Sequence, residues 1–451
     1  MEHKRISANS SRMDPLVAFQ AVPHNDSSSS SITSLCFLGQ LENKDTRLAH
    51  NTLPPRHDQG TEGISSEEEK EEFESHFIRR SNDGGDAKRK ISSSAAALVR
   101  DRLALEGVKL ATCDFEGNAL IWDVASSTVV GRIVDTTRGH GLALRRIVCD
   151  EKEQQPSRFL YHTRDPQGTV SLHDLEKLQT VTAFSTQSHT FCAAVPCQGD
   201  ANLVALPSID GSAVVVRDWR DSPSSKPVAH FFPGEGNNML SSRGRNHHGM
   251  LTSLAMWKGK HANVLLCGME DGSLFFHDWT RIGHAAEATQ SAPLSSNLSL
   301  GSDPILTLDM SPSPDKHSSS PSFVCLAGLA GDAEEVGRLN ERDRGRIAVL
   351  KASQNENGCS WRPRIRTRLG TAEGKPGVAV CRFRSDGRVF VAGGWDRRVR
   401  VFHRDGRALT ILRGHEDAIQ AVDWFADAST GLLASGSSDG RVCVWRAFGT
   451  S

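Results

Sequence analysis

The sequence predicts an all-β protein in which one small antiparallel unit is repeated seven times. Three observations lead to this prediction. A tight turn followed by an apolar run recurs seven times along the chain. A second apolar run precedes each copy, as Leu432–Ser437 does near the C-terminal end. Glycine is abundant at 39 residues, against a single tyrosine, and glycine favours tight turns.

Each copy predicts the second half of a β-hairpin, because Asp and Gly accept the positive φ of a hairpin turn. The seven copies in order are Glu116–Asp123, Gln167–Asp174, Asp210–Asp218, Asp271–Asp278, Arg344–Leu350, Asp396–His403 and Asp439–Arg446. The strands they predict span residues 118–123, 169–174, 212–218, 273–278, 346–351, 398–402 and 441–445.

The bulky residues that end successive copies are 43 to 73 residues apart. The shortest spacings match the period of about 40–45 residues of propeller blades, and the longer ones imply insertions. The prediction is therefore one seven-bladed β-propeller over residues 14–448. Seven unrelated hairpins are the alternative, which the constant offset from turn to bulky residue disfavours.

Residues 411–446 resemble a complete WD40 repeat, with Gly414-His415 at its start and Trp445 at its end. The resemblance implies a structural tetrad of buried, mutually hydrogen-bonded side chains, namely His415, Ser435, Asp439 and Trp445. The other blades retain at most fragments of this pattern and are expected to depend on packing alone. In WD40 propellers an N-terminal segment commonly completes the last blade, so residues 16–19 are expected to be its outer strand.

Long polar stretches interrupt the repeats. Residues 42–107 are acidic and Ser-rich, with the run Glu67–Glu72 at their centre. Such a composition cannot bury enough apolar surface to order itself. We expect this insertion within the first blade, and the loops 220–247 and 284–303, to be disordered. Residues 332–344 are expected to lengthen a turn of the fifth blade.

Lys and Arg number 53 against 54 Asp and Glu, which excludes a chain-wide basic field for nucleic acid. Residues 361–413, however, hold 13 Arg and one Lys against four acidic residues. Arginine pairs readily with carboxylates and phosphates. The candidate partner-binding residues are Arg364, Arg366, Arg397, Arg398 and Arg400, with a protein partner favoured over nucleic acid. The alternative is an outer strand that charge keeps soluble.

No catalytic, cofactor-binding or metal-binding residues are predicted. Gly436–Gly440 matches the G-x-S-x-G pattern of hydrolases, but strand-like residues follow it where a helix is required. His247 and His248 are adjacent without further candidate ligands. No secretory signal or membrane-length apolar run is visible, and the cysteines lie mostly in apolar runs. These features favour a reducing compartment, the nucleus or the cytosol.

Beyond the generic repeat, the chain resembles the ASTRA-associated protein 1 family, whose animal relative is guanine nucleotide-binding protein β-subunit-like protein 1. The resembling segments are Asp14–Val17, Arg346–Lys351, Gly377–Arg388 and Val391–Phe402. The resemblance implies a nuclear, non-enzymatic scaffold linked to chromatin remodelling and to maturation of phosphatidylinositol-3-kinase-related kinases. The implied partners are ASTRA and co-chaperone subunits and Rvb-type AAA+ ATPases.

Two other functions stay open. A G-protein-β-like signalling subunit would need an N-terminal coiled-coil helix, and residues 1–15 show no apolar heptad. A WD40 substrate receptor of a ubiquitin ligase is neither selected nor excluded by the sequence.

Overall fold

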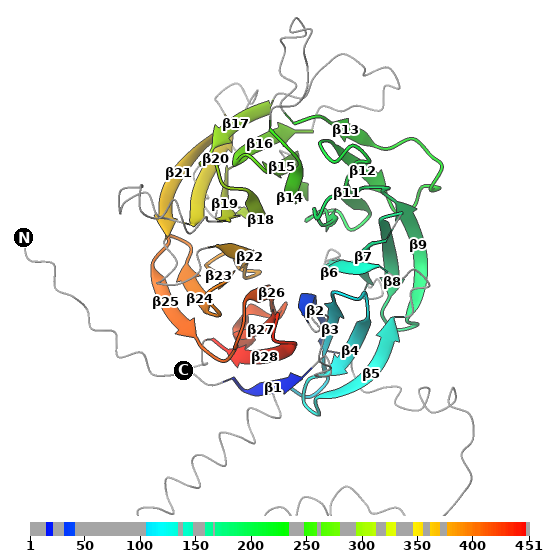
Figure 1. The fold of residues 1–451 in the computed structure, drawn as a ribbon, viewed down its shortest axis with the longest axis vertical. Coiled ribbons are helices and arrows are strands. Elements are labelled where there is room, and N and C mark those ends of the chain that lie inside the picture. The colour runs from blue at the N-terminus through cyan, green and yellow to red at the C-terminus, as the bar shows by residue number, and fades with distance from the viewer. Residues whose placement is uncertain are drawn as a thin grey trace, which may run out of the picture. The chain divides into compact units, whose positions relative to one another are not determined.

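The computed structural model describes residues 15–20, 31–40, 105–133, 139–147, 158–165, 167–233, 248–258, 263–279, 295–312, 322–330, 346–354, 361–369 and 377–447. The chain divides into two compact units, residues 1–39 with 109–451 and residues 40–108. The first unit is a ring of seven four-stranded antiparallel sheets, shown face-on in Figure 1. The predicted seven-bladed all-β propeller is confirmed.

Each blade is one sheet, and its strands follow one another from the centre of the ring to its outer edge (Figure 1). Blade 1 holds β2 (Ile32–Gln40), β3 (Val108–Asp114), β4 (Ala119–Asp123) and β5 (Thr128–Ile133). Blade 2 holds β6 (His140–Ile147), β7 (Arg158–Arg164), β8 (Thr169–Asp174) and β9 (Gln179–Ser185). Blade 3 holds β10 (Val195–Pro196), β11 (Leu203–Pro207), β12 (Val214–Asp218) and β13 (Ala229–Phe231).

Blades 4 to 6 repeat the same order. Blade 4 holds β14 (Leu251–Lys258), β15 (Asn263–Met269), β16 (Ser273–Asp278) and β17 (Ser295–Ser299). Blade 5 holds β18 (Ile305–Pro312), β19 (Ser322–Leu329), β20 (Ile347–Gln354) and β21 (Trp361–Leu369). Blade 6 holds β22 (Val378–Phe383), β23 (Val389–Gly394), β24 (Val399–His403) and β25 (Ala408–Leu412).

Blade 7 is built from both ends of the chain. Its inner three strands are β26 (Ile419–Trp424), β27 (Leu432–Ser437) and β28 (Arg441–Arg446). Its outer strand is β1 (Val17–Gln20), which pairs antiparallel with β28, Val17 opposite Val444. The predicted closing strand is therefore present, shifted by one residue. The ring leaves β28 no open edge.

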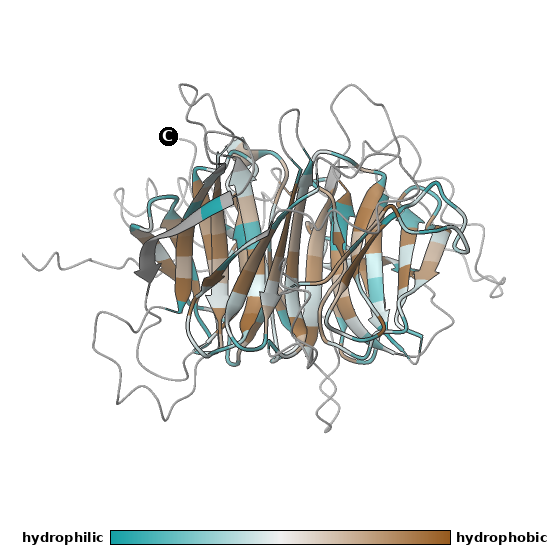
Figure 2. Ribbon diagram, turned by 90° about the horizontal axis from the view of Figure 1, so that it is seen from above, coloured by the Kyte–Doolittle hydropathy of each residue, from teal (hydrophilic) through white to brown (hydrophobic). Residues whose placement is uncertain are grey.

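The hydrophobic core lies largely between neighbouring blades. One buried cluster joins side chains of blades 4 and 5, and another joins those of blades 6 and 7. In the side view the strands are mostly apolar and the connecting loops polar (Figure 2). Burial of nearly whole strands, such as β23 and β27, is expected where a sheet is covered on both faces.

The predicted disordered loops need correction. β13 lies inside the predicted loop 220–247, and β17 lies inside 284–303. Both are outer strands that pair with β12 and β16. Each also adds an apolar side chain to the core, since Phe231 is 1% exposed and Leu298 packs against the cluster of blades 4 and 5. Residues 42–104 and 332–344 lie outside the described residues, and residues 105–107 form a turn.

Helical structure in the described part of the chain is limited to one 3-10 turn, η4 (Ala428–Thr430). No helix there is long and apolar enough to cross a bilayer.

Candidate protein-interaction site

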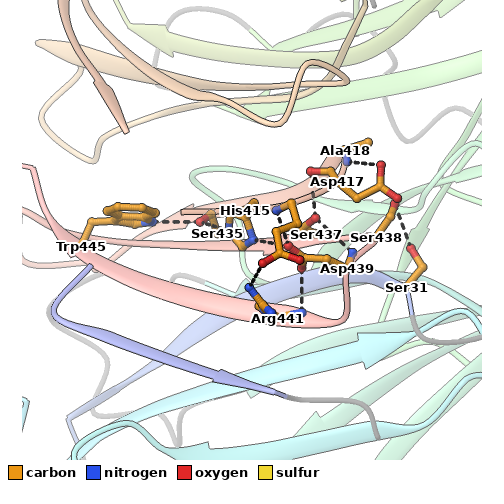
Figure 3. Close-up of polar contacts among 11 residues, drawn as sticks. Ser31, His415, Asp417, Ala418, Ser435, Ser437, Ser438, Asp439, Arg441 and Trp445 are labelled. Atoms are coloured by element: carbon orange, nitrogen blue, oxygen red, sulfur yellow. Dashed lines mark hydrogen bonds and ion pairs between the residues drawn. The ribbon is translucent and has the colours of Figure 1, made fainter. Parts of the chain in front are cut away.

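A chain of buried polar side chains holds blade 7 together (Figure 3). Trp445 on β28 donates its Nε1–H to the Ser435 hydroxyl at 2.8 Å. Ser435 on β27 lies 2.8 Å from Nε2 of His415, whose Nδ1 is 3.3 Å from an Asp439 carboxylate oxygen. The structure thus brings all four predicted tetrad residues together. Because His415 belongs to the loop that enters the blade, the chain of bonds ties that loop to the inner strands.

Asp439 is the charged end of this chain. Burial raises its pKa, but bonds from His415 and from the backbone N–H groups of Glu416 and Arg441 outweigh burial and lower the pKa to about 2. The carboxylate is therefore ionised at neutral pH and orients the turn between β27 and β28. Gly440, which follows it, has φ +73°, a conformation that favours glycine.

Two other blades keep part of this polar chain, which corrects the expectation that they rely on packing alone. In blade 1, Trp122 donates its Nε1–H to the Thr112 hydroxyl at 2.9 Å. In blade 4, Nδ1 of His248 lies 2.8 Å from the Asp271 carboxylate and 3.2 Å from the Ser273 hydroxyl. The sequence signal for the second pair was the spacing: His248 precedes Asp271 by 23 residues, as His415 precedes Asp439 by 24.

Blades 5 and 6 use arginine–aspartate ion pairs at their turns. Arg346, just before β20, pairs with Asp303 in the connection from β17 to β18. In blade 6, Arg400 pairs with Asp396, and their side chains are only 6% and 3% exposed. Arg400 is therefore wrong as a partner-binding candidate. Its position on a strand buried between blades places the guanidinium against the carboxylate of its own turn.

The remaining arginine candidates do not form one demonstrated cluster. Arg397 is exposed and Arg398 half-buried, both in the turn between β23 and β24 of blade 6. Arg364 and Arg366 lie on β21, the outer strand of blade 5. The register with β20 shifts between Ile365 and Thr367, leaving Arg366 without a paired residue. The regular pairing of β21 with β20 is therefore interrupted at Arg366.

The inner strands of the blades line a central cavity, and Arg145 and Arg382 are the charged residues of its lining. Asp309 on β18 and Asp423 on β26 occupy equivalent positions in their blades. Each accepts a backbone N–H from the next blade: Asp309 from Phe383 at 2.6 Å, Asp423 from Phe37 at 2.9 Å. Burial raises the pKa of Asp309 to about 7 and that of Asp423 to about 6, while Arg145 opposes both shifts.

No group of three His, Cys, Asp or Glu side chains among the described residues is arranged to hold a metal ion. His247 lies outside those residues, and His248 is engaged with Asp271. Gly436–Gly440 ends β27 and forms the turn into β28, so its serine lies in a hairpin rather than at a strand-to-helix elbow.

Comparison with known proteins gives the same fold. The family model described as "WD domain, G-beta repeat" matches residues 366–403 and 406–446. Guanine nucleotide-binding protein subunit beta-like protein 1 of Mus musculus is 26% identical over 70% of this chain and 82% of its own length. ASTRA-associated protein 1 of Verticillium alfalfae is 25% identical, over 74% and 77%. The solved β-propeller domain of Cps50 (Swd1) from Myceliophteria thermophila superposes with a TM-score of 0.53 at 14% identity, covering 76% of this chain and 94% of that domain.

Proposed function

We propose that this WD40-repeat propeller, which resembles ASTRA-associated protein 1, is a non-enzymatic scaffold of an ASTRA assembly. The observation that carries the proposal is the similarity to ASTRA-associated protein 1 over 74% of this chain and 77% of that protein. The role implied is to hold ASTRA and co-chaperone subunits and Rvb-type AAA+ ATPases together. That work is linked to chromatin remodelling and to maturation of phosphatidylinositol-3-kinase-related kinases, and the proposed site of action is the nucleus.

The turn between β23 and β24 supports one contact of this scaffold. Arg397 projects from a left-handed backbone position, φ +68°, and is exposed beside the half-buried Arg398. Two guanidinium groups at one turn can each bind a carboxylate, so the turn suits contact with an acidic protein surface.

Affinity purification of the tagged full chain with mass spectrometry tests the proposal. ASTRA subunits and Rvb-type ATPases are the expected partners, and a fluorescent fusion is expected in the nucleus. Arg397→Glu with Arg398→Glu is expected to reduce their recovery at unchanged melting temperature. Arg388→Glu with Arg407→Glu is the matched control, since it changes the same charge at other exposed turns of blade 6. Recovery of ubiquitin-ligase adaptors in place of ASTRA subunits would overturn the assignment.

A further inference from the structure

One face of the ring carries a continuous row of exposed aromatic and aliphatic side chains over blades 1 to 4. The row consists of Phe115, Phe191, Ile209 and Met250, which are 41%, 65%, 62% and 51% exposed. All four lie in turns between the second and third strands of a blade or in connections from one blade to the next. In an antiparallel blade these segments meet at the same end, so the four side chains share one face.

In the first half of the row two ring contacts are joined through the pairing of β6 with β7. The Phe115 ring stacks on His140 with centroids 4.0 Å apart, and Nδ1 of His140 lies 2.7 Å from the Phe115 carbonyl oxygen. His140 is directly opposite Arg164 in the pairing of β6 with β7. The Arg164 guanidinium lies over the Phe191 ring, 3.9 Å from its centroid.

The second half is joined through the backbone. The turn that carries Ile209 meets the start of blade 4, because Leu251 N–H donates to the Gly211 carbonyl at 2.8 Å. A Cβ at Gly211 would lie 2.7 Å from the Thr190 side chain, so the same turn abuts the residue before Phe191. Phe191 also lines the central cavity. The row therefore runs from the rim of blade 1, past the cavity mouth, to blade 4.

Charge along the row is uneven. Arg164 makes no ion pair with any residue that the structure describes, although its guanidinium is held in place by Phe191. The exposed carboxylate of Glu116 lies at the other end, beside Phe115. A guanidinium that is stacked on a ring is held in place to donate hydrogen bonds from its free edge to a carboxylate. Apolar side chains around such a cation are the arrangement found at the centre of protein interfaces.

We propose that this row binds a short segment of a partner protein that places a large apolar side chain against Phe191 and an Asp or Glu carboxylate on Arg164. Complementarity to the unpaired cation selects an acidic segment at this end. Ile209 and Met250 extend the apolar contact toward blade 4. The row is separate from the Arg397–Arg398 turn. This proposal rests on the proposed scaffold function in one respect: both require that the protein binds a protein partner.

Phage display of random 12-residue peptides on the full chain tests this surface. Peptides that combine an acidic residue with Leu, Phe or Trp are expected to be enriched. A synthetic peptide of the enriched sequence is then titrated by fluorescence polarisation. Phe191→Ser is expected to weaken its binding at least tenfold, and Leu409→Ser, an exposed apolar position on β25, is expected to leave it unchanged.

Arg164→Glu gives the sharper result. This variant is expected to lose binding to the acidic peptide and to bind a copy in which lysine replaces the acidic residue. Failure to enrich any peptide, enrichment without acidic residues, or equal binding by Phe191→Ser would each overturn the proposal. Phe191 is mostly exposed, so its variant is expected to fold even if Arg164→Glu does not. If the wild-type chain binds no such peptide but recovers ASTRA subunits, only this surface is refuted. If it binds the peptide but recovers no ASTRA subunits, only the ASTRA assignment is refuted.

Discussion

Trp445 is the most buried large side chain of the last blade, with no exposed surface, and its indole N–H has one acceptor, Ser435. Packing and hydrogen bonding can be separated at this residue. The indole ring fills the interface of blades 6 and 7, whereas the N–H holds the polar chain that ends at Asp439.

Trp445→Ala is expected to destabilise the protein by about 3–5 kcal/mol, because truncation of a buried aromatic side chain leaves a cavity. Trp445→Phe keeps most of the ring but leaves the Ser435 hydroxyl without its donor, a loss of about 1–3 kcal/mol. Chemical denaturation measures both. A Trp445→Phe midpoint equal to that of wild type would show that the indole hydrogen bond adds nothing to the packing of the ring.

Arg400 permits a second test on single residues. Arg400→Met is expected to cost about 3–5 kcal/mol, because it leaves the Asp396 carboxylate buried without its partner. Adding Asp396→Asn should recover part of that loss, since the uncompensated charge is then removed. Arg398→Met, in the adjoining turn, is the control and should change stability by less than about 0.5 kcal/mol. A double variant no more stable than Arg400→Met would contradict the ion-pair explanation.

Among the strands, β1 has the most consequential position, because it covers the edge of β28 and joins the two ends of the chain. Removing residues 1–20 is expected to expose that edge and to produce aggregation on size-exclusion chromatography. Removing only residues 1–14 keeps β1 and serves as the control. A monomeric, fully stable protein without residues 1–20 would mean that the β1–β28 pairing is dispensable.

The sequence predicted strands better than it predicted polar partners. Turn residues and apolar runs are local signals, and all seven predicted blade strands are found within about three residues of their expected ends. The Arg346–Asp303 pair joins residues of two segments separated by an insertion, and no local pattern marks it. Arg400 was misplaced for a related reason: alternation gives the face of a strand, but not whether a neighbouring blade covers that face. The ring contacts of Phe115 with His140 and of Arg164 with Phe191 were likewise invisible, since each joins a loop to a strand that is distant in sequence.

At the scale of the whole ring, Asp309 and Asp423 each bond the backbone of the next blade while buried near the central cavity. Their pKa values of about 7 and 6 lie above the ordinary value of 3.8. At these two carboxyl groups the folded protein therefore binds more protons than the unfolded chain does between about pH 4 and pH 7. Their contribution to stability is complete below the unfolded pKa and is lost as the pH rises through the folded pKa.

Asp309→Asn should consequently flatten the pH dependence. Between pH 5 and pH 8, wild type is expected to lose about 2–3 kcal/mol of stability relative to the variant, because the two pH units below the folded pKa of about 7 each count for about 1.4 kcal/mol. His162 and His277, whose pKa values burial lowers to about 4, act in the opposite direction, but they are common to both proteins. Asp386→Asn is the control, since the pKa of that exposed carboxyl is lowered. Parallel curves for wild type and Asp309→Asn would contradict the shift.

The pairing of β1 with β28 also sets an order of events during translation. Residues 17–20 leave the ribosome before every other strand in Figure 1, yet their partner, residues 441–446, comes last. At a translation rate of about 5–20 residues per second, roughly 20 to 80 seconds pass between the synthesis of β1 and that of β28. Throughout that interval β1 of the nascent chain has no pairing partner, and the ring of blades is incomplete. Rare-codon slowing late in the message would lengthen this exposure, so the yield of soluble protein should depend on elongation speed near the 3′ end.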